Sequence, residues 1–212
     1  MSHSLQGAQF MLAAHRLSQL PDDRGAEVAF AGRSNAGKSS ALNALTNHKG
    51  LARTSRTPGR TQQMVVFGLT QPTPDSGPLP APLRLVDLPG YGYAKVPRAM
   101  REHWQVEIDA YLHQRRSLRG VVLIVDIRHP LKEFDRSMLA FCTATGLPCH
   151  VLLTKADKLS RNQAAQSLAR LLAQCTTEGL TATAQVFSAT AGTGVDAARQ
   201  AVLDLLLAPP AA

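Results

Sequence analysis

The sequence has few acidic residues, so its charge is one-sided. Only 15 of its 212 residues are Asp or Glu, against 23 Lys and Arg, and the formal net charge is +8. A surplus of this size favours a polyanionic partner, either a nucleic acid or an anionic membrane surface. The alternative is that the charge serves only to keep the protein in solution.

Cysteines and long apolar runs are also scarce. The three cysteines, Cys142, Cys149 and Cys175, have neither metal-ligand nor redox-motif spacing, so we expect free thiols in a reducing compartment. The first residues lack the basic and apolar stretches of a secretory signal. No apolar run approaches the roughly 20 residues that a bilayer-spanning helix needs. We therefore expect a soluble, cytoplasmic protein.

Short β-prone runs alternate with segments of helical periodicity, which is the pattern of an α/β protein. The predicted strands are residues 27–31, 62–69, 83–88, 121–126, 149–154 and 184–187. The predicted helices are residues 39–47, 100–112, 131–141, 164–175 and 195–206. We expect one domain with a mostly parallel six-stranded sheet, one antiparallel edge strand and helices on both faces. Residues 70–82, with five prolines, are predicted to be a surface loop between two antiparallel strands.

A phosphate-binding loop is indicated directly after the first predicted strand. The match to G-x-x-x-x-G-K-[ST] consists of Gly32, Arg33, Ser34, Asn35, Ala36, Gly37, Lys38 and Ser39. The two glycines permit backbone angles and close approaches that a Cβ would block, so the loop N–H groups can face phosphate oxygens. Lys38 is expected to neutralise the β- and γ-phosphates, and the Ser39 hydroxyl to bind Mg²⁺. The alternative, a glycine-rich turn without a ligand, is disfavoured by the flanking strand and helix.

A second nucleotide motif follows the strand at residues 83–88. It consists of Asp87, Leu88, Pro89 and Gly90. An Asp at a strand end can support Mg²⁺ through a water molecule, and the N–H group of the Gly can reach the γ-phosphate. Alone, Asp-x-x-Gly is usually only a turn, but its position about fifty residues after a phosphate-binding loop makes it informative.

Two further segments indicate that the base is guanine. Thr154, Lys155, Ala156 and Asp157 end another apolar strand, and Ser188 and Ala189 follow the last one. The Asp157 carboxylate can accept hydrogen bonds from N1–H and the 2-amino group of guanine, whereas adenine offers neither donor there. The Lys155 stem can lie along the base, and a backbone N–H near Ser188 can meet guanine O6.

With these motifs in order, the chain resembles the EngB family (also called YihA or YsxC) of bacterial ribosome-assembly GTPases, within the translation-factor-type P-loop GTPases. The resemblance runs from about residue 10 to residue 207. The matching segments are residues 27–40, 57–62, 87–94, 126–130, 154–157 and 187–189. It implies a G domain at 25–207, an N-terminal extension at 1–24 that packs on it, and a short tail at 208–212.

The resemblance also implies roles for residues near the phosphates. Thr61 matches the switch I threonine that completes the Mg²⁺ shell, so Ser39 and Thr61 are the candidate metal ligands; the alternative for Thr61 is simply the first residue of a strand. The other nucleotide-contacting candidates that it adds are Gly59, Arg60, Gln62, Gln63 and Phe187.

Catalysis is expected to depend on Lys38, Thr61 and Asn35. Tyr91 stands where Ras-like proteins have a water-orienting Gln, so intrinsic turnover should be slow. In related proteins an Asn at the position of Asn35 helps to bind K⁺, which supplies transition-state charge; the alternative role for Asn35 is loop geometry alone. Thr154 replaces a more common Asn, so guanine specificity rests on Asp157.

The implied function is hydrolysis of GTP to GDP and phosphate as a switch in assembly of the large (50S) ribosomal subunit, needed for growth and cell division. We expect a monomer that binds Mg²⁺ together with GTP or GDP. Two rivals remain: an ATP-dependent kinase, and a GTP-gated binding module at a division or membrane site with incidental hydrolysis.

Two basic clusters are candidate rRNA contacts, with solvated helix faces as the alternative. Their residues are Lys49, Arg53, Arg56 and Arg60, and then Lys95, Arg98, Arg101, Arg115, Arg116 and Arg119.

Overall fold

The computed structural model describes residues 4–52, 63–69, 82–91 and 98–208, and for residues 4 and 98–104 the backbone alone. The strands are β1 (Gln9–Ala14), β2 (Ala26–Gly32), β3 (Met64–Gly68), β4 (Leu83–Asp87), β5 (Leu118–Asp126), β6 (Cys149–Thr154) and β7 (Thr183–Val186). The helices are α1 (Lys38–Leu45), α2 (Arg98–Gln114), α3 (Glu133–Thr145), α4 (Arg161–Thr177) and α5 (Val195–Leu207). None of the helices in these described ranges is long and apolar enough to cross a membrane.

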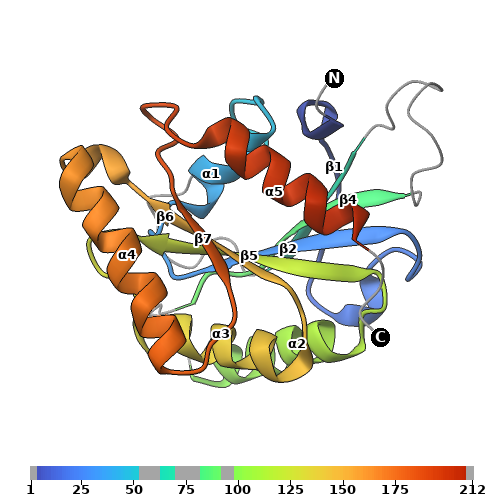
Figure 1. Ribbon diagram of the computed structural model, residues 1–212. Helices are drawn as coiled ribbons and strands as arrows, with labels where there is room; N and C mark the ends of the chain where they lie inside the picture. Colours follow the sequence, from blue (N-terminus) through green and yellow to red (C-terminus); the bar gives the residue numbers. More distant parts are fainter. Residues whose placement is uncertain (1–3, 53–62, 70–81, 92–97, 209–212) are drawn as a thin grey trace.

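The strands form a single sheet in the order β1-β3-β4-β2-β5-β6-β7 (Figure 1). Strands β4, β2, β5, β6 and β7 pair in parallel, whereas β3 is antiparallel to both β4 and β1. The predicted α/β class, the mostly parallel sheet and the single reversed strand are therefore confirmed.

The predicted number of strands is wrong by one, whereas an edge strand that pairs antiparallel to its neighbour is confirmed. Strand β1 covers β3, which lies inside the sheet and not at its edge. The sequence signal for β1 is weak because little of this strand is buried: Phe10 is 61% and Met11 46% exposed, and Ala14 alone among its residues is buried. An edge strand of this kind lacks the one-sided apolar alternation by which strands are predicted.

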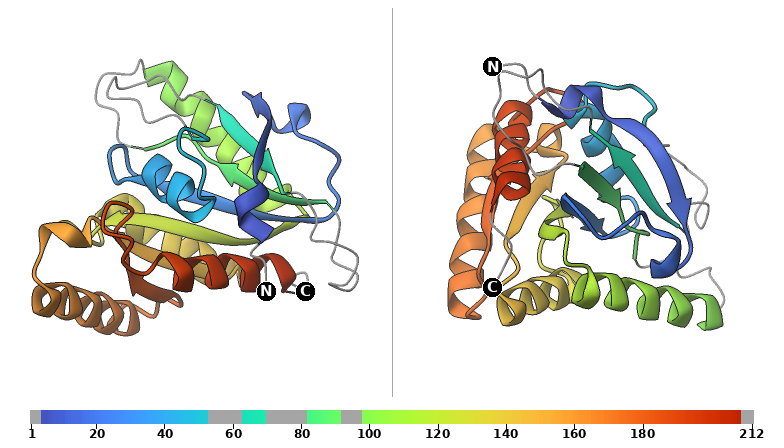
Figure 2. Two further views of the ribbon diagram at one scale, coloured as in Figure 1. Left: turned by 90° about the horizontal axis from the view of Figure 1, so that it is seen from above. Right: turned by 90° about the vertical axis from the view of Figure 1, so that its right-hand side faces the viewer.

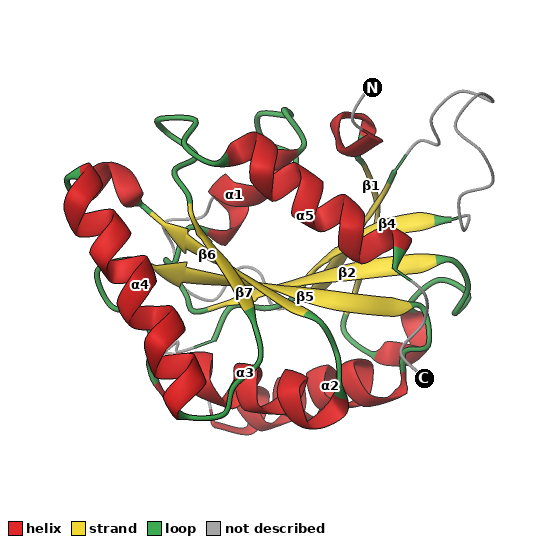
Figure 3. Ribbon diagram, in the orientation of Figure 1, coloured by secondary structure: helices red, strands yellow, loops and turns green. Residues whose placement is uncertain are grey.

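Helices cover both faces of the sheet (Figures 2 and 3). Each face has its own apolar core. On one face, Leu42 of α1 and Val202 of α5 belong to a cluster that includes side chains of β2. On the other face α2, α3 and α4 contribute Tyr111, Leu139 and Leu171. Every residue of β2, β4 and β6 is buried, as expected for parallel strands that are covered by helices on both faces.

The parallel arrangement places several loops together at the carboxyl ends of the strands. Parallel strands β2, β4, β5 and β6 all end at the same side, and the segments after them are residues 33–37, 88–91, 127–132 and 155–160. In open α/β sheets, ligands bind outside the carboxyl ends of the strands. The motifs predicted to bind phosphate and guanine therefore meet at this end of the sheet.

Candidate nucleotide-binding site

The phosphate-binding loop joins β2 to α1, and its glycines have distinct tasks. Gly37 caps α1 with φ +98°, in the left-handed region that side chains rarely adopt. Gly32 has no such angle, but a Cβ there would lie 2.7 Å from the Ile124 carbonyl oxygen of β5. Gly37 is thus required by the backbone conformation, and Gly32 by close packing against the neighbouring strand.

The Asp-x-x-Gly segment lies directly beside this loop. The N–H of Tyr91 donates to the Gly32 carbonyl (3.3 Å), and the N–H of Ser34 donates to the Tyr91 carbonyl (2.7 Å). A Cβ on Gly90 would stand 3.6 Å from Ser34. Two segments about fifty residues apart in the sequence are therefore joined by backbone hydrogen bonds, as their spacing predicted.

Lys38 and Asp87 form a buried ion pair at the junction of the two segments. Burial raises the pKa of the Asp87 carboxyl above its usual value, and the Lys38 ammonium only partly opposes that shift. Phosphate groups compete for Lys38, and a hydrated cation competes for Asp87. The pair therefore consists of two groups that a bound Mg²⁺–nucleotide would engage separately.

The donor set fits a magnesium ion held mainly by a nucleotide. Within the described residues, no group of three or more His, Cys, Asp or Glu side chains is arranged to bind a metal. Mg²⁺ commonly uses one or two protein ligands together with substrate phosphates and water. Ser39, next to Lys38 on α1, and Asp87 at the end of β4 supply this kind of set.

The guanine motif is tied to the phosphate loop by side chains. Thr154 Oγ1 donates to the Ala36 carbonyl at 2.5 Å, and Lys155 Nζ donates to the Asn35 carbonyl at 2.6 Å. Asn35 and Lys155 both have left-handed backbones, with φ of 61° and 60°. For a residue other than glycine this region is uncommon, and Asn adopts it more readily than most. The left-handed backbone is therefore a reason for an Asn at position 35 that does not require a bound cation.

Asp157 is oriented by the segment that follows β7. Its Oδ1 accepts a hydrogen bond from Ser188 Oγ (2.7 Å), and Ser188 Oγ accepts one from the Ala191 N–H (3.1 Å). The hydrogen bonds from Ser188 and Lys158 lower the pKa of the Asp157 carboxyl. The Ala156 N–H also donates to the Phe187 carbonyl. The structure therefore brings the two predicted guanine segments together around an ionised carboxylate.

The structure describes only some of the remaining predicted nucleotide contacts. Gly59, Arg60, Thr61 and Gln62 lie outside the described residues. Gln63 is described, and its Nε2 lies 2.7 Å from His15 Nε2. Leu88 is fully buried, and its N–H donates to the Phe30 carbonyl, so this residue anchors the motif in the core.

Sequence reasoning assigned no role to Asp126, which ends β5 beside Lys155. Its Oδ2 lies 2.9 Å from Lys155 Nζ, and Arg128 binds both of its oxygens at 2.9 and 2.7 Å. Burial works against this charge, but hydrogen bonds from Arg128 and Lys155 hold the pKa of Asp126 far below its usual value. The three side chains line a pocket of about 230 Å³ next to the phosphate loop. The available signal was an Asp at the carboxyl end of a central strand.

The ring of Tyr91 packs against α3. The ring stacks on Phe134 of α3, with centroids 3.9 Å apart and planes 24° apart. Its hydroxyl is largely desolvated, and burial together with nearby Asp109 raises the pKa of Tyr91. This placement agrees with the expectation that Tyr91 does not orient water as a glutamine would.

One predicted rRNA contact is wrong. Arg115 belongs to the second basic cluster of the sequence, but it is buried, and its NH2 lies 2.7 Å from Glu27 Oε1. Arg119 is half-buried, and its NH2 donates to the Gly25 carbonyl. Lys49 and Arg116 are exposed, as a contact with a polyanion requires. Arg53, Arg56, Arg60 and Lys95 lie outside the described residues, as do the side chains of Arg98 and Arg101.

Comparisons with known proteins agree with this site. Residues 27–155 match the family described as "50S ribosome-binding GTPase". The chain is 56% identical over 200 residues to "Probable GTP-binding protein EngB" of Stenotrophomonas maltophilia, covering 94% of this chain and 95% of that protein. It is 58% identical over 172 residues to the protein of the same name from Xylella fastidiosa, covering 81% and 79%.

The fold is also found in solved structures. A crystal structure of a probable GTP-binding protein engB superposes with a TM-score of 0.61 at 20% identity, covering 85% of this chain and 98% of that one. A variant of Aquifex aeolicus Era bound to GDP and AlF4⁻ gives a TM-score of 0.68 at 20% identity, covering 89% and 58%. Identities this low show the fold alone. The family match and the close relatives show more: the chain belongs to the EngB family of GTP-binding proteins and is a P-loop GTPase.

Proposed function

We propose that the protein is a cytoplasmic GTP-driven switch in assembly of the large ribosomal subunit, needed for growth and division. The observation that carries this proposal is the joining of the phosphate loop to both guanine segments, together with a family description that names the 50S subunit. The net charge of +8 supports an RNA-rich partner. The ATP-dependent kinase is disfavoured because Asp157 matches the donors of guanine and not those of adenine.

The proposed mechanism assigns separate tasks to the residues of the site. Lys38 and the loop N–H groups hold the phosphate charge, and Lys155 and Asp157 select the base. Ser39 and Thr61 would hold Mg²⁺, with Asp87 supporting its hydration shell; the bound ion would neutralise charge that develops on the phosphates. We also propose slow turnover and stimulation by K⁺ through Asn35. Equal turnover in Na⁺ and K⁺ buffers would contradict the cation role.

Co-sedimentation with immature large subunits tests the ribosomal role. We expect the protein to sediment with these particles in the presence of a non-hydrolysable GTP analogue and to remain largely in solution with GDP. Phosphate contacts should also make binding fall as salt rises. Binding that is indifferent to both nucleotide and salt would reject the switch.

The second candidate is a GTP-gated binding module whose hydrolysis is incidental. It is supported by Tyr91, which stands in place of a glutamine and whose ring packs on Phe134 of α3. A variant that binds GTP but does not hydrolyse it distinguishes the two: complementation of a strain lacking the protein favours the module, and failure favours a cycling switch. In both cases we expect a monomer.

A further inference from the structure

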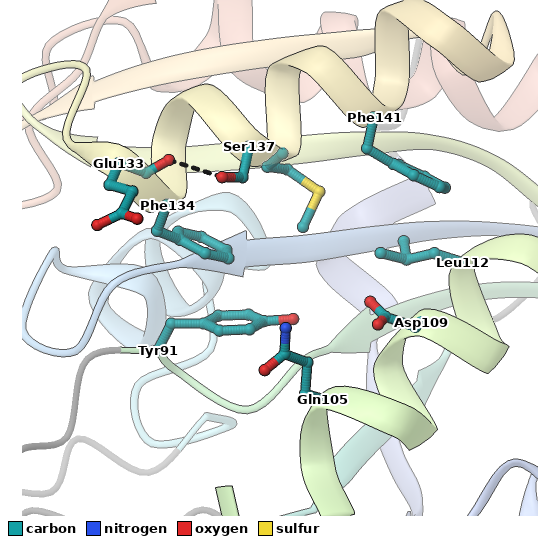
Figure 4. Close-up of a pocket in the computed structure, with 9 residues that line it drawn as sticks. Tyr91, Gln105, Asp109, Leu112, Glu133, Phe134, Ser137 and Phe141 are labelled. Atoms are coloured by element: carbon teal, nitrogen blue, oxygen red, sulfur yellow. Dashed lines mark hydrogen bonds between the residues drawn. The ribbon is translucent and has the colours of Figure 1, made fainter. Parts of the chain in front are cut away.

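A groove separates α2 from α3 beside the phosphate loop (Figure 4). It encloses about 370 Å³, and its apolar surface is formed by Leu112, Phe134, Met138 and Phe141 with the ring of Tyr91. These side chains come from both helices and from the segment after β4. Figure 4 shows Tyr91, Leu112 and Phe134 facing the same space. Apolar and aromatic linings of this kind are typical of sites that take an apolar side chain.

The polar part of the groove is acidic. Asp109 on α2 and Glu133 on α3 line it, with the neutral side chains of Gln105 and Ser137. Among the described residues that line the groove, none is Lys, Arg or His. In a chain with a net charge of +8, this local excess of negative charge attracts cations and repels phosphate groups. The groove is therefore suited to a basic polypeptide and unsuited to RNA.

Tyr91 links the groove to the nucleotide site. Its ring lies in the groove and stacks on Phe134, while its backbone hydrogen-bonds to Gly32 and Ser34 of the phosphate loop. The preceding residue, Gly90, is the one expected to meet the γ-phosphate. Any shift of this segment on GTP binding moves a wall of the groove, so the two sites share one physical element.

We propose that the α2–α3 groove is a nucleotide-coupled docking site for a polypeptide segment with an apolar side chain next to Lys or Arg. The inference rests on the proposed ribosomal role for the source of the segment, a basic protein of the large-subunit precursor. The apolar side chain contacts the Tyr91–Phe134 stack, and the basic side chain pairs with Asp109 and Glu133.

Direct binding of two synthetic peptides tests the chemistry. The probes are fluorescein-labelled acetyl-KRLFRKLAK-amide and the same peptide with Glu in place of every Lys and Arg. With a GTP analogue bound, we expect the basic peptide to bind at least tenfold more tightly than the acidic one, and more tightly than with GDP. Equal binding of the two peptides, binding indifferent to nucleotide, or no binding of the basic peptide would overturn the proposal.

Two variants locate the binding. The double variant D109N/E133Q removes both charges, and Ser137→Trp fills the groove; each should weaken binding of the basic peptide about tenfold. Asp204→Asn is the matched control, because Asp204 is an exposed acid on α5, on the other face of the sheet, and it should change binding less than twofold. GDP affinity checks that each variant is folded. Unchanged peptide affinity in both groove variants would contradict the location.

Photocross-linking from position 137 separates protein from RNA on the particle itself. We expect cross-links to a protein segment with Lys or Arg beside an apolar residue, and cross-links to rRNA would overturn the proposal. Co-sedimentation distinguishes failure of the proposed ribosomal role from failure of the proposed docking groove. If wild type and D109N/E133Q sediment equally well, the ribosomal role stands and the groove is rejected. If neither sediments but the peptide results hold, the groove stands and its proposed source is rejected.

Discussion

The two ends of the sheet both bury charge, but they arrange it differently. At the end away from the nucleotide site, Glu27 accepts hydrogen bonds from Arg84, Arg115 and Tyr111, at distances from 2.7 to 3.2 Å. At the other end, Asp87 has a single ion-pair partner among the described residues, Lys38. Burial raises the pKa of Asp87, which indicates that this carboxylate is incompletely compensated.

The difference separates a structural cluster from a binding site. The two arginines around Glu27 also donate to backbone carbonyls of Arg24 and Pro21, and so fasten the segment before β2 to the sheet. Charges that pair with several groups within the protein have little left to offer a ligand. Charges such as Lys38 and Asp87 retain partners to gain, which is the condition for binding phosphate and metal. Changes at the first end should alter stability, and changes at the second should alter ligand binding.

The largest effect is expected for Asp157→Asn. The amide group cannot accept both guanine donors, so affinity for GDP should fall about 10⁴-fold, as in other sites built around a buried hydrogen bond. Xanthine carries a C2 carbonyl in place of the 2-amino group, and the Asn amide can donate to it. Competition of GDP and xanthosine diphosphate (XDP) against a fluorescent nucleotide measures this change in base preference. Retained preference for GDP would place the guanine contact elsewhere.

Glu27→Gln tests the opposite end of the sheet. It removes the buried anion that Arg84 and Arg115 share, and leaves Arg115 only the more distant Asp23 at 3.5 Å. This loss should lower the free energy of unfolding by about 3–5 kcal/mol. Urea unfolding measures the loss, and the ratio of GDP to XDP affinity should not change. Asp22→Asn is the control, because the Asp22–Arg24 pair is highly exposed and contributes little. A changed base preference in the Glu27 variant would break the separation between the two ends.

Asp126→Asn tests whether Asp126 belongs with the binding site. Without its charge, Lys155 loses an anchor beside the phosphate loop, and affinity for GDP should fall about tenfold, or about 1.4 kcal/mol. The preference for GDP over XDP should remain, because Ser188 holds Asp157 independently. Arg128→Gln leaves the Lys155–Asp126 pair intact and serves as the control. Unchanged affinity would make the Asp126 contacts purely structural.

Asn35→Gly separates the side chain of Asn35 from its backbone. Glycine adopts the φ of 61° without strain, so the phosphate loop should keep its shape while the carboxamide is lost. We expect turnover in K⁺ to fall to the rate in Na⁺, with GDP affinity changed about twofold at most. Asn35→Ala also removes the carboxamide but strains the left-handed backbone, so comparing it with Asn35→Gly shows the cost of that strain. Persistent stimulation by K⁺ in the glycine variant would exclude the side chain as the ligand.

The meeting of the candidate nucleotide-binding motifs was predictable because their signals are local. The phosphate loop lies within eight residues, and the order of the other motifs along the chain locates them at one edge of a parallel sheet. Long-range pairing was not predictable. Glu27 and Arg115 are 88 residues apart, so Arg115 read as a surface charge although it is buried. Strand β1 was missed for a different reason: its exposed side chains give no periodic pattern.

The smallest effect concerns His150, which lies on β6 near the structural end of the sheet. Its ring nitrogens lie 2.7 Å from Thr183 Oγ1 and 3.1 Å from Gln185 Oε1, and burial lowers the pKa of His150 below its usual value. The unfolded chain therefore binds a proton more readily than the folded one, so stability should fall as the pH drops below about 6.5. The urea midpoint should decrease from pH 7 to pH 5, and less so in His150→Gln, which cannot titrate. An equal decrease in both proteins would show that folding does not shift the pKa of His150 and would assign this pH dependence to other groups.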